Sequence, residues 1–316
     1  MPLRLKKISI GSTYLVYPIL ILLLIASEII SPGFLTPNHM ESVLRTSAFL
    51  GIAAIGQTFV ILLGGIDLSI GAVISFANLM SAQIMNSSDA NVLTAFVSVL
   101  VMGLVCGILN GLGIFYFRIP SLVMTLGMSG ILNGVSLLYS NGAPKGATAP
   151  AVEFISTGRI GNIFPVILLI WIVLAAAAII ILKYTVFGRS LYILGTNATV
   201  AHYSGIKISL LTISIYTIST LMAAVTGFLL VGYTGTSFLN IGNSYTMNTI
   251  ASVVVGGTLI TGGSGSYSGS IAGSIIMTII YGLVTIIHLP ESGRLIIQGL
   301  IIILLVLVYA REKGTK

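Results

Sequence analysis

Long apolar runs separated by short turn-forming segments dominate this chain and constrain its fold more than any other feature. Most are long enough to cross the hydrocarbon core of a bilayer as a helix, which takes about 20 apolar residues. Only 7% of the 316 residues are charged, whereas a soluble domain carries about 25%. The sequence predicts one all-α integral membrane domain over residues 1–316, with some helices short or broken. The expected spans, about ten, are 14–30, 43–63, 68–86, 91–111, 119–140, 163–182, 208–232, 246–261, 270–288 and 294–310.

Basic residues predict the orientation of these spans, because cytoplasmic loops carry an excess of Lys and Arg. An even number of spans places both termini on the same side of the membrane. With the termini inside, ten basic residues fall on the cytoplasmic side and four outside, which accounts for the net charge of +7 without nucleic acid as a partner. The inner group is Arg4, Lys6, Lys7, Arg118, Lys183, Arg189, Lys207, Arg311, Lys313 and Lys316, and the outer group is Arg45, Lys145, Arg159 and Arg294.

Motifs for catalysis, metal binding and nucleotide binding are missing from the sequence. It has no HExxH, no CxxC and no G-x-x-x-x-G-K-[ST] loop, and its one cysteine, Cys106, falls in an apolar run. His39, His202 and His288 fall in loops or at the ends of spans. We therefore expect no catalytic residue, no metal site and no cofactor on this chain. If ATP drives the protein, another chain binds it.

Asp67 is the one acidic residue expected within the membrane-spanning part. A charge there is costly and usually functional. Asp67 also precedes an apolar run in the segment Gly64–Gly71, where a carboxylate suits the N-cap of a helix. Proton coupling is the weaker alternative, because proton-coupled carriers use several intramembrane carboxylates or histidines.

The other polar residues of the expected spans are uncharged. They suit a passage for a neutral, hydroxyl-bearing solute, and they equally suit hydrogen bonds between helices. A permanently charged solute would call for an intramembrane partner of opposite sign. The candidate residues of a translocation pathway are Gln57, Asp67, Asn78, Asn110, Asn133 and Asn248, with Ser219, Thr220, Thr226 and Thr249 as further polar positions.

Two ladders of glycines recur at every fourth residue, in opposite halves of the chain. In helices, such glycines line one face and let a neighbouring backbone approach closely. We interpret both ladders as helix-packing surfaces, and their positions indicate an internal duplication. The ladders are Gly103, Gly107 and Gly111, and Gly265, Gly269 and Gly273.

Residues 187–206 form the longest polar interruption between apolar runs. Such a segment cannot lie unpaired in hydrocarbon, so it is expected to be a cytoplasmic loop with a short helix of its own. An ordered loop at this place offers a docking site for a soluble partner.

Five segments in this order resemble a known family. The chain is similar, from about Phe34 to Arg311, to the membrane-spanning permease subunits of bacterial carbohydrate ABC importers, the group serving ribose, xylose, related sugars and autoinducer-2. The segments are Phe34–Asn38, Gly65–Gly71, Tyr139–Pro144, 187–206, and Ile250–Thr258 followed by Gly262–Ser266.

The resemblance implies a bacterial inner-membrane protein with many spans that moves a sugar and has no enzymatic activity of its own. Its implied partners are a second permease chain, identical or related, a cytoplasmic ATP-binding subunit and an extracytoplasmic sugar-binding protein, with membrane lipid around them. The ATPase would grip the segment 187–206. The residues that match the family there, and so are expected to couple to the ATPase, are Gly188, Arg189, Gly195, Asn197, Ser204, Gly205 and Ile206.

Two departures from the family pattern limit what the resemblance implies. Ala198 and Thr199 stand where members more often have an acidic residue and an alanine. The segment Tyr233–Asn248 lacks the Gln-Pro and acidic residues common in ribose-type members, so ribose is not assigned. The alternatives are an ABC permease for nucleosides or branched-chain amino acids, an ion-coupled secondary carrier, and an intramembrane enzyme.

Overall fold

The computed structural model describes residues 12–161, 164–286, 293, 296, 299 and 300. In this part of the chain, two strands of two residues each form a small hairpin, β1 and β2, and the other elements are helices. The elements are α1 Ser12–Ile30, α2 Pro37–Leu63, α3 Ile70–Met85, η1 Asp89–Asn91, α4 Val92–Phe115, α5 Ser121–Ser140, α6 Pro150–Thr157, β1 Arg159–Ile160, β2 Phe164–Pro165, α7 Val166–Tyr184, α8 Val186–Thr196, α9 Ala198–Tyr203, α10 Ile208–Thr234, α11 Asn243–Val255 and α12 Tyr267–Ile286.

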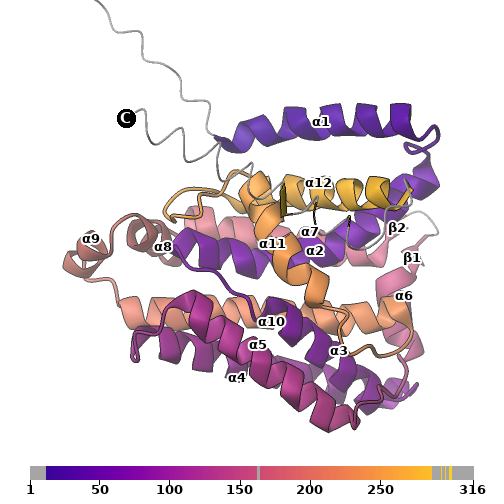
Figure 1. Cartoon of the computed structure of the whole chain (residues 1–316), viewed down its shortest axis with the longest axis horizontal. Helices are drawn as coiled ribbons and strands as arrows, with labels where there is room; N and C mark the ends of the chain where they lie inside the picture. The colour runs from indigo at the N-terminus through magenta and orange to yellow at the C-terminus, as the bar shows by residue number, and fades with distance from the viewer. Residues whose placement is uncertain (1–11, 162–163, 287–292, 294–295, 297–298, 301–316) are drawn as a thin grey trace, which may run out of the picture.

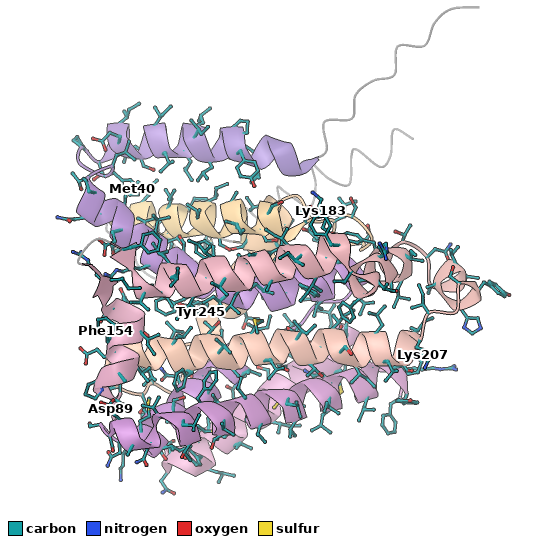
Figure 2. All side chains as sticks on the ribbon, turned by 180° about the vertical axis from the view of Figure 1, so that it is seen from behind. Met40, Asp89, Phe154, Lys183, Lys207 and Tyr245 are labelled. Carbon is teal, nitrogen blue, oxygen red and sulfur yellow. The ribbon has the colours of Figure 1, made fainter. Side chains whose placement is uncertain are left out.

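The long helices lie side by side, so the molecule has two ends (Figure 1). The α6 end carries α6, β1 and β2, and the α9 end carries α8 and α9. Figure 2 places Lys183 and Lys207 at the α9 end, and Asp89 and Phe154 at the α6 end. Loops that the sequence assigned to opposite sides of a membrane thus lie at opposite ends of the bundle.

Within the described residues, six helices are long and apolar enough to cross a membrane. The expected span 246–261 is wrong as a full crossing, because α11 has 13 residues and ends at Val255, before the Gly256–Gly257 pair. Thirteen residues make a helix of about 20 Å, short of the roughly 30 Å hydrocarbon core. α3, with 16 residues, is also short. The expected span 294–310 lies almost entirely outside the described residues, as do Arg4, Lys6, Lys7, His288, Arg294, Arg311, Lys313 and Lys316.

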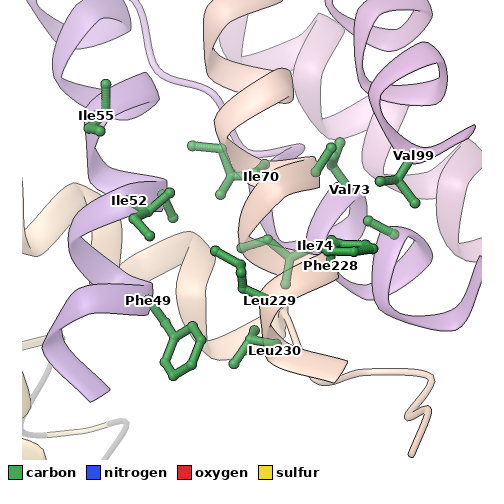
Figure 3. Packing of buried hydrophobic residues seen from close by; sticks show 14 of the residues in the cluster. Phe49, Ile52, Ile55, Ile70, Val73, Ile74, Val99, Phe228, Leu229 and Leu230 are labelled. Carbon is green, nitrogen blue, oxygen red and sulfur yellow. The ribbon is translucent and has the colours of Figure 1, made fainter. Parts of the chain in front are cut away.

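α2 is the central helix of the bundle. Every residue from Ser47 to Leu62 is buried, as expected for a helix that is apolar all round. Around it, α10 packs against α2, α3 and α4, and Ile52, Ile74 and Leu229 meet in the core (Figure 3). Helices α4, α5 and α7 leave most of their apolar surface exposed, which suits contact with lipid.

A long helix followed by a short one occurs twice, in opposite directions. α2 and α10 each have 27 residues and run in opposite directions in Figure 1. Each ends at a glycine with left-handed backbone, Gly64 (φ 90°) and Gly235 (φ 78°), before an irregular segment and the short helix α3 or α11. The starts of α3 and α11 meet, because side chains on Gly71 or Gly242 would overlap the other's carbonyl oxygen. This is an inverted repeat, as found in many transporters.

The first glycine ladder lies directly on α10. A Cβ atom on Gly107 would overlap the backbone of Thr217 and the hydroxyl of Thr220, and the Thr220 hydroxyl donates to the Gly103 carbonyl at 2.7 Å. In the second ladder, Gly269 and Gly273 on α12 face the end of α11. Gly265 does not share this face, because it precedes α12 and has φ +143°.

Gly107→Ala should destabilise the protein, whereas Gly134→Ala should not. Both changes raise helix propensity equally, but Gly107 meets the α10 backbone and Gly134 on α5 has no atom within 4 Å of a built Cβ. Overpacking of this kind costs about 1–3 kcal/mol. Thermal unfolding of the purified chain in detergent, followed by size-exclusion chromatography, measures the difference. Equal midpoints for the two variants would contradict the packing observed here.

Candidate functional site

The break between α2 and α3, residues 64–69, is irregular backbone that runs from the exposed Gly64 to the fully buried Asp67 and Ser69. Such backbone is tolerated at membrane depth only where protein groups satisfy it. Ser121 and Thr125, at the start of α5, do so. The amide of Leu68 donates to the Thr125 hydroxyl at 3.0 Å, and the amide of Ile66 donates to the Ser121 hydroxyl at 3.4 Å. The Thr125 hydroxyl also lies 3.3 Å from the Ile66 carbonyl. Two side chains one helical turn apart therefore hold the break in place.

Asp67 ties the same break to α10 and α4. Its fully buried carboxylate accepts from the Ser69 amide at 2.9 Å, the Ser69 hydroxyl at 2.5 Å and the Ser219 hydroxyl of α10 at 2.7 Å. Asn110 of α4 donates to the Ser69 hydroxyl at 3.1 Å. Hydrogen bonds to a charged acceptor are about twice as strong as neutral ones. The carboxylate thus accepts from the break and from α10, and the Ser69 hydroxyl extends the network to α4.

The interpretation of Asp67 as a helix N-cap is wrong. α3 begins at Ile70 with Ser69 in the capping position, and no side chain caps its first turn. Asp67 lies two residues before the cap and bonds the cap residue itself. In the described part of the chain both ion pairs involve Glu41, so Asp67 has hydroxyl and amide partners and no basic one.

A junction of main-chain atoms lies at the α9 end of the bundle. The Gly263 amide donates to the Leu62 carbonyl at 2.9 Å, which joins the loop before α12 to the last turn of α2. Gly195, near the end of α8, fits against both groups, because its Cβ would overlap the Leu62 oxygen. The Tyr192 hydroxyl donates to the Gly265 carbonyl at 2.9 Å. We call Leu62, Tyr192, Gly195, Gly263 and Gly265 the glycine junction.

The segment 187–206 contains two helices, α8 and α9, where the sequence predicted one. The Asn197 side chain caps α9 by accepting from the amides of Thr199 at 2.9 Å and Val200 at 3.1 Å. Gly205 closes α9 with a left-handed φ of 74°. α9 projects beyond the rest of the bundle (Figure 1), and Tyr203 at its end is 85% exposed.

The residues expected to couple to the ATPase have different surroundings in this segment. Gly188 and Gly195 face inward, and a Cβ on Gly188 would overlap the carbonyls of Ile181 and Leu182. Arg189, Asn197, Ser204 and Gly205 are exposed, and Ile206 is half-buried.

The expected pathway residues do not form one site. Gln57, Asp67, Asn78 and Asn110 are fully buried, and Asn133 is exposed on α5. The irregular segment between α10 and α11, residues 235–242, is the second break, and Asn78 stabilises it, because its side-chain oxygen accepts from the Phe238 amide at 3.1 Å. The side-chain nitrogen and oxygen of Gln57 have no partner among the described residues.

Asn248 lies beside a cavity of about 220 Å³ between α2, α11 and α12.

The sequence did not predict Ser121, Thr125 and Tyr192 as functional residues. It carried a signal only for Ser121 and Thr125, as two hydroxyls four residues apart at the start of the span 119–140.

Ser219→Ala should destabilise the protein more than Thr226→Val on the same helix. Ser219 donates across to Asp67, whereas the buried Thr226 hydroxyl bonds only the carbonyl of Met222 in its own helix. Loss of the donor leaves a buried carboxylate oxygen unpaired, which costs about 1–3 kcal/mol or more. The unfolding midpoint in detergent measures this cost, and a Thr226→Val effect as large as that of Ser219→Ala would refute the assigned role of the network.

The sequence matches known transport proteins over most of its length. A family model described as branched-chain amino acid transport system / permease component matches residues 39–306. The ribose import permease protein of Escherichia coli K12 is 32% identical over 294 residues, 92% of this chain and 91% of the relative. The fructose import permease protein of Rhizobium meliloti is 30% identical over 298 residues, 92% and 83% of the two chains.

A third relative is a probable ABC transporter permease protein of Escherichia coli K12, YphD, 36% identical over 280 residues, 88% of this chain and 83% of the relative. No solved structure matches the chain. The family model and these relatives cover far more than half of the sequence. The chain therefore belongs to the family of ABC transporter permease components.

Proposed function

We propose that this chain is the membrane-spanning subunit of an ABC importer for a monosaccharide, driven by a separate ATPase. The names of the relatives, which import ribose and fructose, support a sugar, although the family model is named for branched-chain amino acids. The interior supports a neutral solute. A zwitterion would call for intramembrane partners of both signs, and the buried carboxylate in the described part is already engaged by Ser69 and Ser219.

The α9 end faces the cytoplasm in this proposal, and the α6 end faces outward. Lys183 and Lys207 lie at the α9 end (Figure 2), as does α8, which carries Arg189 (Figure 1), and the sequence has no acidic residue near any of them. At the α6 end, Arg45 and Arg159 are paired with Glu41 at 2.6 and 3.0 Å. Counted as Lys and Arg alone, the sequence assigns ten basic residues to the side of Lys183, Arg189 and Lys207 and four to the other, which supports the α9 end as the inner one. About ten spans, with α3 and α11 as partial ones and both termini inside, complete this inner-membrane protein.

The glycine junction is the observation that carries the proposal. It joins α8, at the base of the projecting α9, to the last turn of α2, directly before the first break, and to the loop before α12. A movement of α8 must displace Leu62 and Gly263, because no side chain separates the main-chain atoms. An ATPase that binds α9 more tightly in one nucleotide state would thereby favour one arrangement of α2 and the loop before α12 over another.

The partners of this proposal are a second permease chain, an ATP-binding subunit at α9 and an extracytoplasmic sugar-binding protein. The sugar-binding protein would dock at the α6 end, where Asn38, Glu41, Arg45, Arg159 and Tyr233 line a polar hollow of about 640 Å³. The chain itself would catalyse no reaction and bind no ATP. ATP would bind the partner, because the sequence has no phosphate-binding loop.

Uptake by the reconstituted complex tests the proposal. The tagged chain is purified with its bound partners from native membranes, and the partners are identified by mass spectrometry. In proteoliposomes, the complex should take up labelled ribose, xylose or fructose only with ATP, and leucine not at all. ATP-driven uptake of leucine would favour the amino-acid alternative. Uptake driven by an ion gradient without an ATPase would overturn the proposal.

Tyr192→Phe should weaken coupling while the complex still assembles. The change removes only the hydroxyl that donates to the half-buried Gly265 carbonyl, and loss of this hydrogen bond costs about 1 kcal/mol. We expect the number of sugar molecules taken up per ATP hydrolysed to fall at least about fivefold. Tyr184→Phe is the matched control, since Tyr184 is 65% exposed at the same end of the bundle. A wild-type ratio in Tyr192→Phe would remove the glycine junction from the mechanism.

A further inference from the structure

A groove separates the first turn of α8 from the first turn of α10. It has a volume of about 540 Å³, with Arg189 and Lys207 at its polar side, Ser190 and Ser204 beside them, and Ile193 and Leu210 among its apolar lining. The groove therefore combines two cations and two hydroxyls with an apolar wall.

Among the described residues, the two cations of this groove have no anionic partner. Both side chains are exposed, and the ion pairs of this part of the chain both involve Glu41. The sequence has no Asp or Glu from Phe154 to Pro290. Two unpaired positive charges next to one cavity favour an anion from outside the chain.

The groove lies at the depth where lipid head groups are expected. Lys183 and Tyr184 end the apolar helix α7, and Lys207 directly precedes the apolar helix α10. Lys, Arg and Tyr at the ends of spans mark the membrane–water interface. Val186 and Leu210, beside the groove, are 68% and 58% exposed apolar side chains, which fits a contact with acyl chains.

We propose that this groove binds the head group of an anionic phospholipid. The Arg189 guanidinium and the Lys207 ammonium would hold the phosphate, because an arginine fork matches phosphate geometry and a lysine adds a point charge. Ser190 and Ser204 would donate to the remaining oxygens, and the acyl chains would lie along Val186 and Leu210. Two cations select an anionic lipid over a zwitterionic one.

The ATPase is the less favoured occupant. α9 projects beyond the bundle (Figure 1), so α9 is the part that a soluble protein reaches first. The groove instead lies between α8, α10 and the segment Ser204–Lys207 that joins α9 to α10, and apolar side chains of α8 and α10 line much of it. The lipid site requires only insertion in the membrane with the α9 end at one interface, so it holds whichever solute the protein carries.

Native mass spectrometry of the full chain tests this site directly. The detergent-solubilised chain is mixed with phosphatidylglycerol or, as the zwitterionic comparison, phosphatidylcholine. Each basic residue near a membrane surface contributes about a fivefold gain in affinity for an anionic lipid. We therefore expect phosphatidylglycerol affinity to fall about fivefold in Lys207→Gln and about 25-fold in Arg189→Gln/Lys207→Gln. Phosphatidylcholine binding should stay at background throughout.

Lys183→Gln is the matched control, because Lys183 lies at the same interface over the Tyr184 ring, outside the groove. An equal loss in this variant would reduce the site to general surface charge and overturn the proposal. Displacement of the lipid by an equal concentration of glycerol phosphate would assign the groove to a soluble phosphate. If the double variant keeps its lipid and loses the copurifying ATPase, the groove belongs to the ATPase. Unchanged size-exclusion profiles show that each variant is folded, and Lys207→Gln alone tests the site if the double variant is not.

Discussion

The need to satisfy backbone polar groups at the centre of a membrane protein governs this structure. Two long helices end at left-handed glycines, and the irregular backbone that leads from each one to the short helix α3 or α11 requires partners. At the first break the partners are hydroxyls of α5 and the Asp67 carboxylate. At the second break they include Asn78, which accepts from the Phe238 amide. Asp67 and Asn78, two of the residues that the sequence marked as a pathway for solute, thus accept hydrogen bonds from the irregular backbone after α2 and α10.

The same requirement explains why the helices pack as they do. The break after α2 must lie within reach of α4, α5 and α10, which supply Asn110, Thr125 and Ser219. The glycines of α4 allow this approach by bringing α4 onto the α10 backbone. Close packing and polar satisfaction therefore depend on each other, since a wider separation of α4 from α10 would draw Asn110 away from the Asp67 network.

Hydropathy and glycine spacing were enough to predict an all-helical membrane protein, most of its helices and the packing face at Gly103 and Gly107. The short length of α11 was not predictable in this way, because Val253–Val255 and Leu259–Ile260 read as one apolar run on either side of Gly256. The Asp67 network also escaped prediction. Ser219 follows Asp67 by 152 residues, and local pattern shows only that a carboxylate before an apolar run fits a cap. Contacts between distant segments need the fold.

The glycine junction has a consequence for how such proteins diversify. Its contacts join main-chain atoms of Leu62, Gly195 and Gly263, which every sequence with glycine at these positions supplies alike. In the proposed importer, side chains elsewhere in the interior could change without altering how α8 contacts α2 and the loop before α12. Substitutions that adapt the protein to another solute would then leave the coupling to the ATPase intact.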